Sequence, residues 1–246
     1  MSAPAARLSV REKFAYGLGD TASNFFFQAF NLFLFYYYTD VFGLSAAAVG
    51  TMMLFTRILD AVTDPLMGII ADRTNTRWGK FRPWILWGAI PYGLLGYLMF
   101  ANPSLSGNGK LIYAYVTYSL MWLAYTVVNI PYSALMGVMS PSSEDRTSLS
   151  TYRFVCAFAG AFLISALTLP LKDFLGGDDP AAGFRYTMAL FAVVSVGLFF
   201  YTFATTRERV TPPRGQSGSL RADLGALFRN RPWVVLFIAA FLTLAN

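Results

Sequence analysis

The chain has 246 residues, of which 56% are hydrophobic and only 13% are charged, and its mean hydropathy is +0.49. This composition is too apolar for a soluble domain of that length, so it indicates a chain embedded in a lipid bilayer. The net charge of +6 requires no nucleic-acid partner, because nearly all of the basic residues lie in the connections between apolar runs, where they orient a membrane protein.

Six apolar runs follow one another, and each has about the 20 residues needed to cross the hydrocarbon core of a bilayer. They cover residues 14–39, 45–71, 83–101, 111–139, 149–171 and 184–205. A seventh run begins at Pro232 and stops at Asn246, about 15 residues later, which is short of a full crossing. The sequence therefore predicts an all-α membrane protein with a six-helix bundle plus the truncated start of a seventh transmembrane helix.

Three parts are expected along the chain. The transmembrane bundle takes residues 1–206, a cytoplasmic middle loop residues 207–230, and the start of the seventh helix residues 231–246. The loop opens with Pro, Gly and Ser, which is typical of a linker between two bundles. Helical spacing relates Leu220, Leu224, Leu227 and Phe228. We therefore expect a short amphipathic helix there, either on the membrane surface or packed without lipid contact.

The distribution of lysine and arginine predicts the orientation. Basic residues gather in residues 7–13, 73–82 and 207–231, whereas the opposite side has only Lys110, Lys172 and Arg185. Because cytoplasmic loops hold the excess of positive charge, the N-terminus is expected in the cytoplasm. No separate apolar segment precedes the first run, so we expect no cleavable signal peptide.

The second run contains three charges in RILDAVTDPLMG. Arg57, Asp60 and Asp64 are spaced i, i+3 and i+7, so they line one face of a helix. A charge at the bilayer centre costs at least ~2.5–3.5 kcal/mol, so this face must point into the bundle. An internal Arg57–Asp60 salt bridge is the structural alternative, but it leaves Asp64 in need of a mobile cation, a proton or another basic group. Pro65 frees the carbonyl of Ala61, and such hard oxygen ligands suit sodium.

Polar stripes mark other runs as well. They comprise Asp20, Asn24, Gln28 and Asn31 in the first run, Tyr125, Asn129 and Ser133 in the fourth, and Arg153 in the fifth. Amides, hydroxyls, aromatic rings and a guanidinium are the groups that a hydroxylated ligand such as a sugar requires. Hydrogen bonding between helices for assembly alone is the alternative interpretation.

Three stretches resemble a known family. They are YYYTDVFGLSAAAVGTMMLFTRILDAVTDPLMG, the loop ADRTNTRWGKFRPW, and AYTVVNIPYSALMG. All three are similar to the glycoside–pentoside–hexuronide:cation symporters, a major-facilitator family that includes the melibiose and glucuronide carriers. The resemblance extends from about Lys13 to the linker ending in RNRPW and rests on the D-x-x-x-D-P pair and the RWGKFRPW loop.

The resemblance implies a sugar:cation symporter driven by Na⁺ or H⁺ through alternating access, with no cofactor beyond the coupling cation. It also implies a bacterial-type inner (plasma) membrane, contact with lipid, and a cavity between two six-helix halves. The chain would then be the N-terminal half, in need of a C-terminal half or a partner subunit. A non-transporting sugar-binding or scaffold half-protein is the alternative. A membrane enzyme is not expected, because no histidine and no acid–base pair outside the second run is present.

Residue roles follow from the same resemblance. It implies that Asp60 and Asp64 bind the coupling cation, with Thr63 and Thr126 as nearby oxygen ligands. The expected sugar-facing residues are Asp20, Asn24, Tyr125, Asn129 and Arg153. The expected gate or structural residues are Arg57, Asp72, Arg77, Lys80 and Arg82.

Two departures from the melibiose carrier bear on the substrate. That carrier has aspartates where this chain has Asn24 and Asn129, and a tryptophan where this chain has Ser133. The NIPY tetrapeptide is instead similar to glucuronide carriers. Two amides in place of carboxylates would leave Arg153 free to pair with an anionic uronide. The expected small-molecule partner is therefore a hexuronide or a neutral pentoside rather than an α-galactoside.

Overall fold

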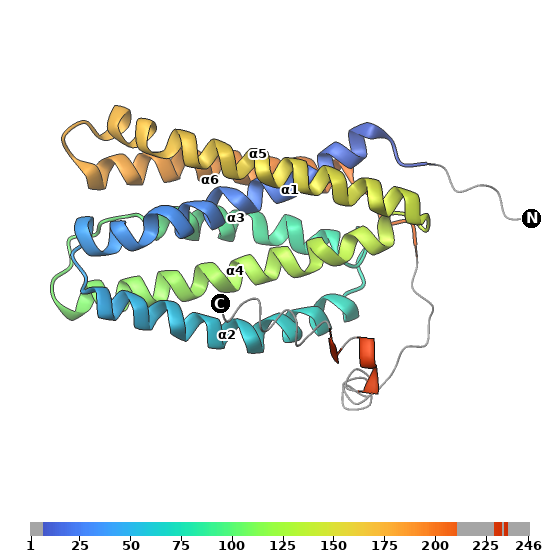
Figure 1. Ribbon diagram of the computed structural model, residues 1–246, viewed down its shortest axis with the longest axis horizontal. Coiled ribbons are helices and arrows are strands. Elements are labelled where there is room, and N and C mark those ends of the chain that lie inside the picture. Colours follow the sequence, from blue (N-terminus) through green and yellow to red (C-terminus); the bar gives the residue numbers. More distant parts are fainter. Residues whose placement is uncertain (1–6, 211–228, 233, 236–246) are drawn as a thin grey trace, which may run out of the picture. The chain divides into compact units, whose positions relative to one another are not determined.

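The computed structural model describes residues 7–210, 229–232, 234 and 235. The chain divides into two compact units, Met1–Val210 and Thr211–Asn246, and all the elements of the first unit are helical (Figure 1). They are α1 (Val10–Ala29), the π-helical segments η1 (Phe30–Leu34) and η2 (Tyr37–Val41), α2 (Ala46–Arg73), α3 (Arg82–Leu98), α4 (Asn108–Met139), α5 (Ser143–Gly176) and α6 (Pro180–Thr205).

Helix boundaries follow local sequence signals. Side-chain oxygens of Ser9, Ser45, Ser142 and Asp179 accept hydrogen bonds from backbone N–H groups in the first turns of α1, α2, α5 and α6. Such caps satisfy donors that have no partner inside the helix. α2 continues through Pro65 to Arg73, so this proline does not end the helix that carries the three charges.

Four of the helices in the described part of the chain are long and apolar enough to cross a membrane: α2, α4, α5 and α6. α1 and α3 do not qualify by length and composition. α1 contains Arg11, Glu12 and Lys13 in its first half and Asp20 at its midpoint, and α3 has only 17 residues. The protein is therefore an integral membrane protein with an all-helical fold, whereas the predicted number of spans is not confirmed.

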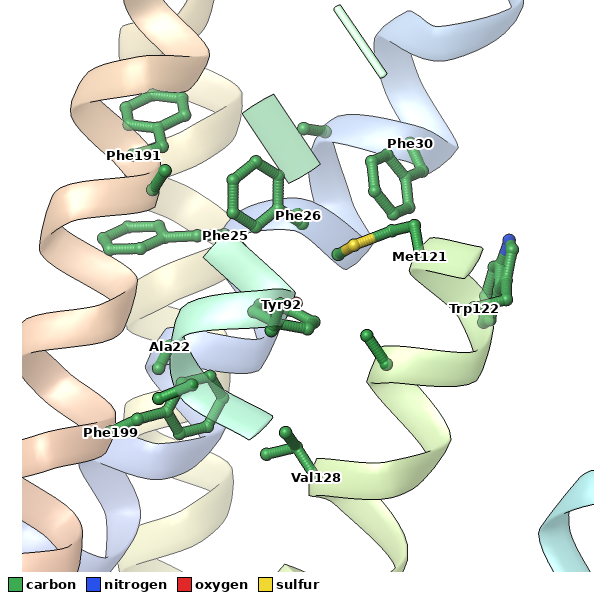
Figure 2. Close-up of a cluster of buried hydrophobic side chains, with 14 of the residues drawn as sticks. Ala22, Phe25, Phe26, Phe30, Tyr92, Met121, Trp122, Val128, Phe191 and Phe199 are labelled. Atoms are coloured by element: carbon green, nitrogen blue, oxygen red, sulfur yellow. The ribbon is translucent and has the colours of Figure 1, made fainter. Parts of the chain in front are cut away.

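α1 and α3 hold the first unit together. α1 packs against α5 and α6, α3 packs against α4 and α6, and α2 packs chiefly against α4. Figure 2 shows buried side chains from α1, α3, α4 and α6 meeting in one cluster. The Phe25 ring stacks on Phe191 at 5.5 Å between centroids, and the Tyr92 ring meets Phe26 at 5.5 Å and Phe199 at 5.4 Å. This aromatic cluster fixes α1 relative to α3 and α6.

Two glycines bring α1 close to its polar neighbours. A Cβ atom on Gly17 would lie 2.8 Å from the backbone oxygen of Tyr152 in α5. A Cβ atom on Gly19 would lie 2.4 Å from the ring of Tyr132 in α4. Since such distances exclude any larger side chain, the glycines allow an approach that places Asp20 within reach of both helices.

Several large apolar side chains remain uncovered by the described residues. On α2, Leu54 and Ile58 are each 63% exposed, and on α5 Phe158 and Phe162 are each 71% exposed. In water such faces would be unfavourable, but hydrocarbon or another apolar helix covers them without cost. The exposed faces thus agree with a protein whose surroundings are lipid.

Two predictions concern residues near the end of the sequence. The amphipathic helix expected around Leu220, Leu224, Leu227 and Phe228 lies outside the described residues, as does most of the expected seventh run. Among the described residues of the second unit, 229, 231, 232, 234 and 235 have helical backbone.

Candidate functional site

Asp20 and Arg153 form an ion pair that connects α1 to α5. Arg153 Nε donates to Asp20 Oδ2 over 2.7 Å, and Arg153 Nη2 donates to Asp20 Oδ1 over 3.1 Å. The two side chains are only 22% and 12% exposed. A bidentate ion pair of this kind is among the strongest contacts that a guanidinium makes, because two parallel hydrogen bonds add to the charge attraction.

Two tyrosines enclose this ion pair. The Tyr132 hydroxyl lies 2.8 Å from Asp20 Oδ2 and 2.6 Å from the Tyr16 carbonyl oxygen. Tyr16 in turn donates from its hydroxyl to the Tyr132 carbonyl oxygen over 2.9 Å. The Arg153 guanidinium carbon lies 5.0 Å from the centroid of the Tyr132 ring. Asp20 therefore has protein partners on two sides. Arg153 is already paired, whereas the sequence suggested that it would be free.

Amide and hydroxyl groups extend the polar region along α1 and α4. Asn24 donates from Nδ2 to the carbonyl oxygen of Asp20 over 2.9 Å. Ser133 Oγ lies 3.5 Å from both Asn129 Oδ1 and Arg153 Nη2. Asn24, Asn129 and Ser133 are half-buried. The structure thus brings four of the five predicted sugar-facing residues into one polar region.

The fifth predicted sugar-facing residue, Tyr125, belongs to an aromatic group. Its ring stacks on Phe27 at 5.9 Å between centroids and meets the edge of Trp122 at 5.4 Å. The indole Nε1 of Trp122 is buried and has no hydrogen-bond partner among the described residues. Aromatic faces with a spare donor are suited to a sugar, which offers C–H faces and hydroxyl acceptors.

The carboxylates of α2 lie on the side of this helix that meets α4. Thr126 of α4 donates from Oγ1 to Asp64 Oδ1 over 2.7 Å. Asp60 Oδ1 and Thr63 Oγ1, in contrast, are buried and lack a partner in the part of the chain that the structure describes. An unpartnered buried polar group costs about 1–3 kcal/mol, so these oxygens fit a ligand that supplies the missing contact, such as a small cation or a proton.

Arg57 does not neutralise these carboxylates by direct contact. Its guanidinium carbon lies 5.4 Å from the centroid of the Trp122 ring, and Asp60 Oδ1 remains without a partner among the described residues. The salt bridge between Arg57 and Asp60, considered above as a structural alternative, is therefore not formed. The described residues also contain no group of three or more His, Cys, Asp or Glu side chains that could hold a metal ion.

Of the five predicted gate or structural residues, Arg57 lies within α2, and the other four lie near the end of α2, in the loop after it or at the start of α3. Lys80 Nζ pairs with Asp72 Oδ1 at 2.9 Å, and the Arg77 guanidinium carbon lies 4.4 Å from the centroid of the Trp78 ring. Arg82 donates from Nη2 to the carbonyl oxygen of Phe203 in α6 over 2.6 Å. The loop between α2 and α3 thus contacts α2 through Lys80, and the start of α3 contacts α6 through Arg82.

No pattern in the sequence indicates a role for Glu208, which follows α6. Its carboxylate accepts hydrogen bonds from the backbone N–H groups of Lys80, Phe81 and Arg82, at 2.8, 2.7 and 3.0 Å. The partners are more than 120 residues apart in sequence, so no local pattern indicates the contact. A carboxylate at the start of α3 also interacts favourably with the helix dipole.

A second such residue is Glu12, at the start of α1. Arg209 donates from Nη1 and Nη2 to the two carboxylate oxygens of Glu12, each over 2.7 Å. Hydrogen bonding to this carboxylate raises the pKa of Arg209 above its usual value. Lys13, the next residue, pairs with Asp145 of α5 at 2.8 Å. These two ion pairs link the start of α1 to α5 and to the segment that follows α6.

The chain is similar to known transport proteins. The sequence model of a family described as "MFS/sugar transport protein" matches residues 15–246. The inner membrane symporter YicJ of Escherichia coli strain K12 is 48% identical over 229 residues, which are 93% of this chain and 50% of that protein. The putative glycoside/cation symporter YagG of the same strain is 46% identical over 230 residues, 94% of this chain and 50% of that protein.

A third relative comes from another bacterium. The isoprimeverose transporter of Lactiplantibacillus pentosus is 40% identical over 234 residues, which are 94% of this chain and 49% of that protein. The chain thus spans about half the length of the curated relatives it matches. These relatives are transporters rather than enzymes, which agrees with the expectation from the sequence.

Proposed function

Because the chain belongs to the MFS/sugar transport protein family, we propose that it takes part in secondary active transport, in which a sugar crosses the membrane together with a coupling cation. The main structural support is the pair of unpartnered oxygens, Asp60 Oδ1 and Thr63 Oγ1, beside the Asp64–Thr126 hydrogen bond. The names of the relatives, one of which is a putative glycoside/cation symporter, support the same assignment.

The proposed architecture has six membrane spans, so α1 and α3 also cross the bilayer, and the N-terminus lies in the cytoplasm. Residues 1–206 form the bundle, 207–230 the middle loop and 231–246 the beginning of a seventh span. The α2 and α5 faces that expose Ile58 and Phe158 contact lipid or a second half of the transporter. The membrane is the inner membrane of a bacterial-type cell, in agreement with the name of the inner membrane symporter YicJ.

The chemistry of coupling follows from the charges on α2. A cation between Asp60 and Asp64, with the hydroxyls of Thr63 and Thr126 beside it, would offset two negative charges in a region of low dielectric constant. Na⁺ accepts hard oxygen ligands, and protonation of a carboxylate has the same electrostatic effect. Because Trp122 and Tyr125 are on the same helix as Thr126, cation binding also orders the wall on which the sugar packs.

Coupling of this kind is reciprocal. If the cation tightens sugar binding by a given factor, the sugar must tighten cation binding by the same factor. Alternating access then requires that the carrier reorients readily only when it is empty or when both ligands are bound. Asp64 is central in this scheme because it has both a charge and a defined hydroxyl partner.

The decisive experiment measures uptake of 4-nitrophenyl xylosides and glucosides into vesicles with the protein expressed from its own gene. We expect an inward Na⁺ or proton gradient to stimulate uptake, and Asp64→Asn to reduce that stimulation about tenfold or more, since one charge contact to a cation is lost. Asp178→Asn, at an exposed loop position, serves as the matched control and should behave as the parent protein does. Full stimulation in Asp64→Asn, inserted at normal levels, would refute the cation assignment.

A further inference from the structure

The guanidinium of Arg57 has two alternative neighbours. Asp60 lies three residues further along α2, and residues with that spacing are neighbours on one face of a helix and can form ion pairs. The structure places the guanidinium elsewhere, with its carbon 5.4 Å from the centroid of the Trp122 ring in α4. Asp60 Oδ1 meanwhile has no hydrogen-bond partner in the described part of the chain. Arg57 thus lies against a ring face rather than against a carboxylate.

The Trp122 ring is held in place by four other aromatic rings. Tyr118 and Tyr125 of α4 meet it edge to face, with centroids 6.1 and 5.4 Å away. Phe27 and Phe30 approach it from the side of α1, at 6.3 and 6.4 Å. Trp122 is only 8% exposed, and Figure 2 shows it on the α4 side of the buried cluster. Its neighbours therefore fix the face that it presents to Arg57.

Trp122 and Thr126 lie one turn apart on α4 and both contact the charged face of α2. Trp122 meets Arg57, and Thr126 donates to Asp64 Oδ1 over 2.7 Å. Asp60 lies between Arg57 and Asp64 on the same face of α2. A guanidinium paired with Asp60 would occupy a carboxylate that the coupling cation is proposed to use, so the cation would have to displace it.

We propose that Trp122 is a positioning residue for the coupling cation: its ring holds Arg57 away from Asp60 and so keeps this carboxylate available to the cation. The inference rests on the proposed function and adds to it a residue that contributes no oxygen ligand. Without the ring, Arg57 would move to Asp60 and compete with the cation. Because the electron-rich face of the ring attracts the guanidinium, an aromatic residue is required at this position.

The test measures cation affinity with and without the ring. Uptake of 4-nitrophenyl xylosides and glucosides, at saturating sugar, is followed in vesicles with the protein expressed from its own gene. The variable is the concentration of Na⁺ or H⁺, whichever cation drives the parent protein. In Trp122→Leu, which keeps an apolar side chain without a ring, the half-maximal cation concentration should rise about threefold or more, as expected for one lost cation–π contact. Trp122→Phe retains a ring face and should stay closer to the parent value.

A second substitution shows whether the effect depends on Arg57. Arg57→Gln alone should not raise the half-maximal cation concentration, because removal of a positive charge favours cation binding. In the Arg57→Gln background, Trp122→Leu should have no further effect, since the competitor is absent. Lost packing or a lost sugar contact at Trp122 would instead raise the value in both backgrounds. Trp87→Leu is the matched control, because Trp87 is 47% exposed on α3 and should keep the parent value.

Fluorinated tryptophans provide a measurement that does not depend on the stability of Trp122→Leu. Incorporated at position 122 by codon suppression, they keep the shape of the ring nearly unchanged, while fluorine withdraws electron density from the face that attracts a cation. The half-maximal cation concentration should rise with each added fluorine in the parent protein. It should stay constant in the Arg57→Gln background.

The outcomes separate this inference from the proposed function. Cation-stimulated uptake by the parent protein, with an unchanged half-maximal cation concentration in Trp122→Leu inserted at normal levels, overturns the inference and leaves the transport function intact. An equal rise in both backgrounds overturns it as well, and so does a fluorine series without a trend in the parent protein. If the parent protein takes up none of these sugars under a Na⁺ or proton gradient, the proposed function itself fails.

Discussion

Two groups of buried charges in this protein have opposite surroundings. Asp20 and Arg153 satisfy each other with two hydrogen bonds, whereas Asp60 Oδ1 and Thr63 Oγ1 have no partner among the described residues. Since a buried polar or charged group is costly unless it has a partner, the first group is satisfied within the protein and the second fits the proposed coupling cation. This contrast is the reason for proposing cation binding at α2 rather than at Asp20.

The tyrosine enclosure around Asp20 depends on Gly19. In Gly19→Ala the new methyl group would meet the Tyr132 ring at 2.4 Å, and that ring is fully buried and stacked on Tyr16 at 4.7 Å. We expect a loss of about 1–3 kcal/mol in the free energy of unfolding, as is typical of overpacked cores. Thermal or denaturant unfolding of the protein in detergent measures it.

Gly197 supplies the matched control for this change. It lies within α6, and a Cβ atom there would meet nothing within 4 Å. Gly197→Ala should therefore leave stability unchanged or increase it by up to about 1 kcal/mol, because alanine favours the helix. Equal stability of the two variants would contradict the close packing inferred at Gly19.

At the scale of elements, the start of α3 depends on a residue after α6. The Glu208 carboxylate accepts three backbone hydrogen bonds from residues 80–82, and Arg82 returns a contact to the Phe203 carbonyl of α6. In both contacts the start of α3 donates, and α6 or the segment after it accepts. Movement of α3 relative to α6 must therefore break them together, which makes this junction a cooperative part of the proposed gate.

Glu208→Gln tests this junction. The neutral amide loses the helix-dipole interaction, and its nitrogen cannot accept a hydrogen bond, so we expect a loss of about 1–2 kcal/mol in stability and faster hydrogen exchange at the amides of residues 80–82. Glu144→Gln is the control, because Glu144 is 83% exposed and its partner Arg7 is 88% exposed. That exposed pair should contribute less than about 1 kcal/mol. Unaltered hydrogen exchange at residues 80–82 would argue against capping of α3 by Glu208.

At the scale of the whole molecule, the direction of the chain across the bilayer is a testable consequence of its charges. The connection after α3 should face outward and the connection after α2 inward, because basic residues gather in the latter. Ser106 and Asn75 are exposed positions in these connections. The native Cys156 is only 5% exposed, so it reacts little with added reagents.

An impermeant maleimide distinguishes the two sides. In intact spheroplasts we expect Ser106→Cys to be labelled and Asn75→Cys to be labelled only after permeabilisation, with a contrast of about tenfold or more in labelling rate, since an intact bilayer excludes a charged reagent. Labelling of Asn75→Cys in intact spheroplasts would reverse the proposed orientation. The unsubstituted protein gives the background from Cys156.

Much of the fold could be predicted from the sequence because it depends on local signals. The first of the six apolar runs corresponds to α1, η1 and η2, and each of the other five corresponds to one helix. Capping residues such as Ser45 and Asp179 mark where helices begin. The periodicity of Asp60 and Asp64 likewise placed them on one face of α2. The number of membrane spans cannot be confirmed in the same way, since α1 has charges in its first half and α3 is short.

The lipid environment, the helices and the polar side chains that must turn inward can be predicted from the sequence, because hydropathy and helical spacing are properties of neighbouring residues. Which of those side chains meet depends on how the helices pack. Arg153 and Asp20 are 133 residues apart in the chain, and Glu208 is 126 from Arg82. A charge has no preferred partner until packing brings one near, so these two pairings could be known only from the fold.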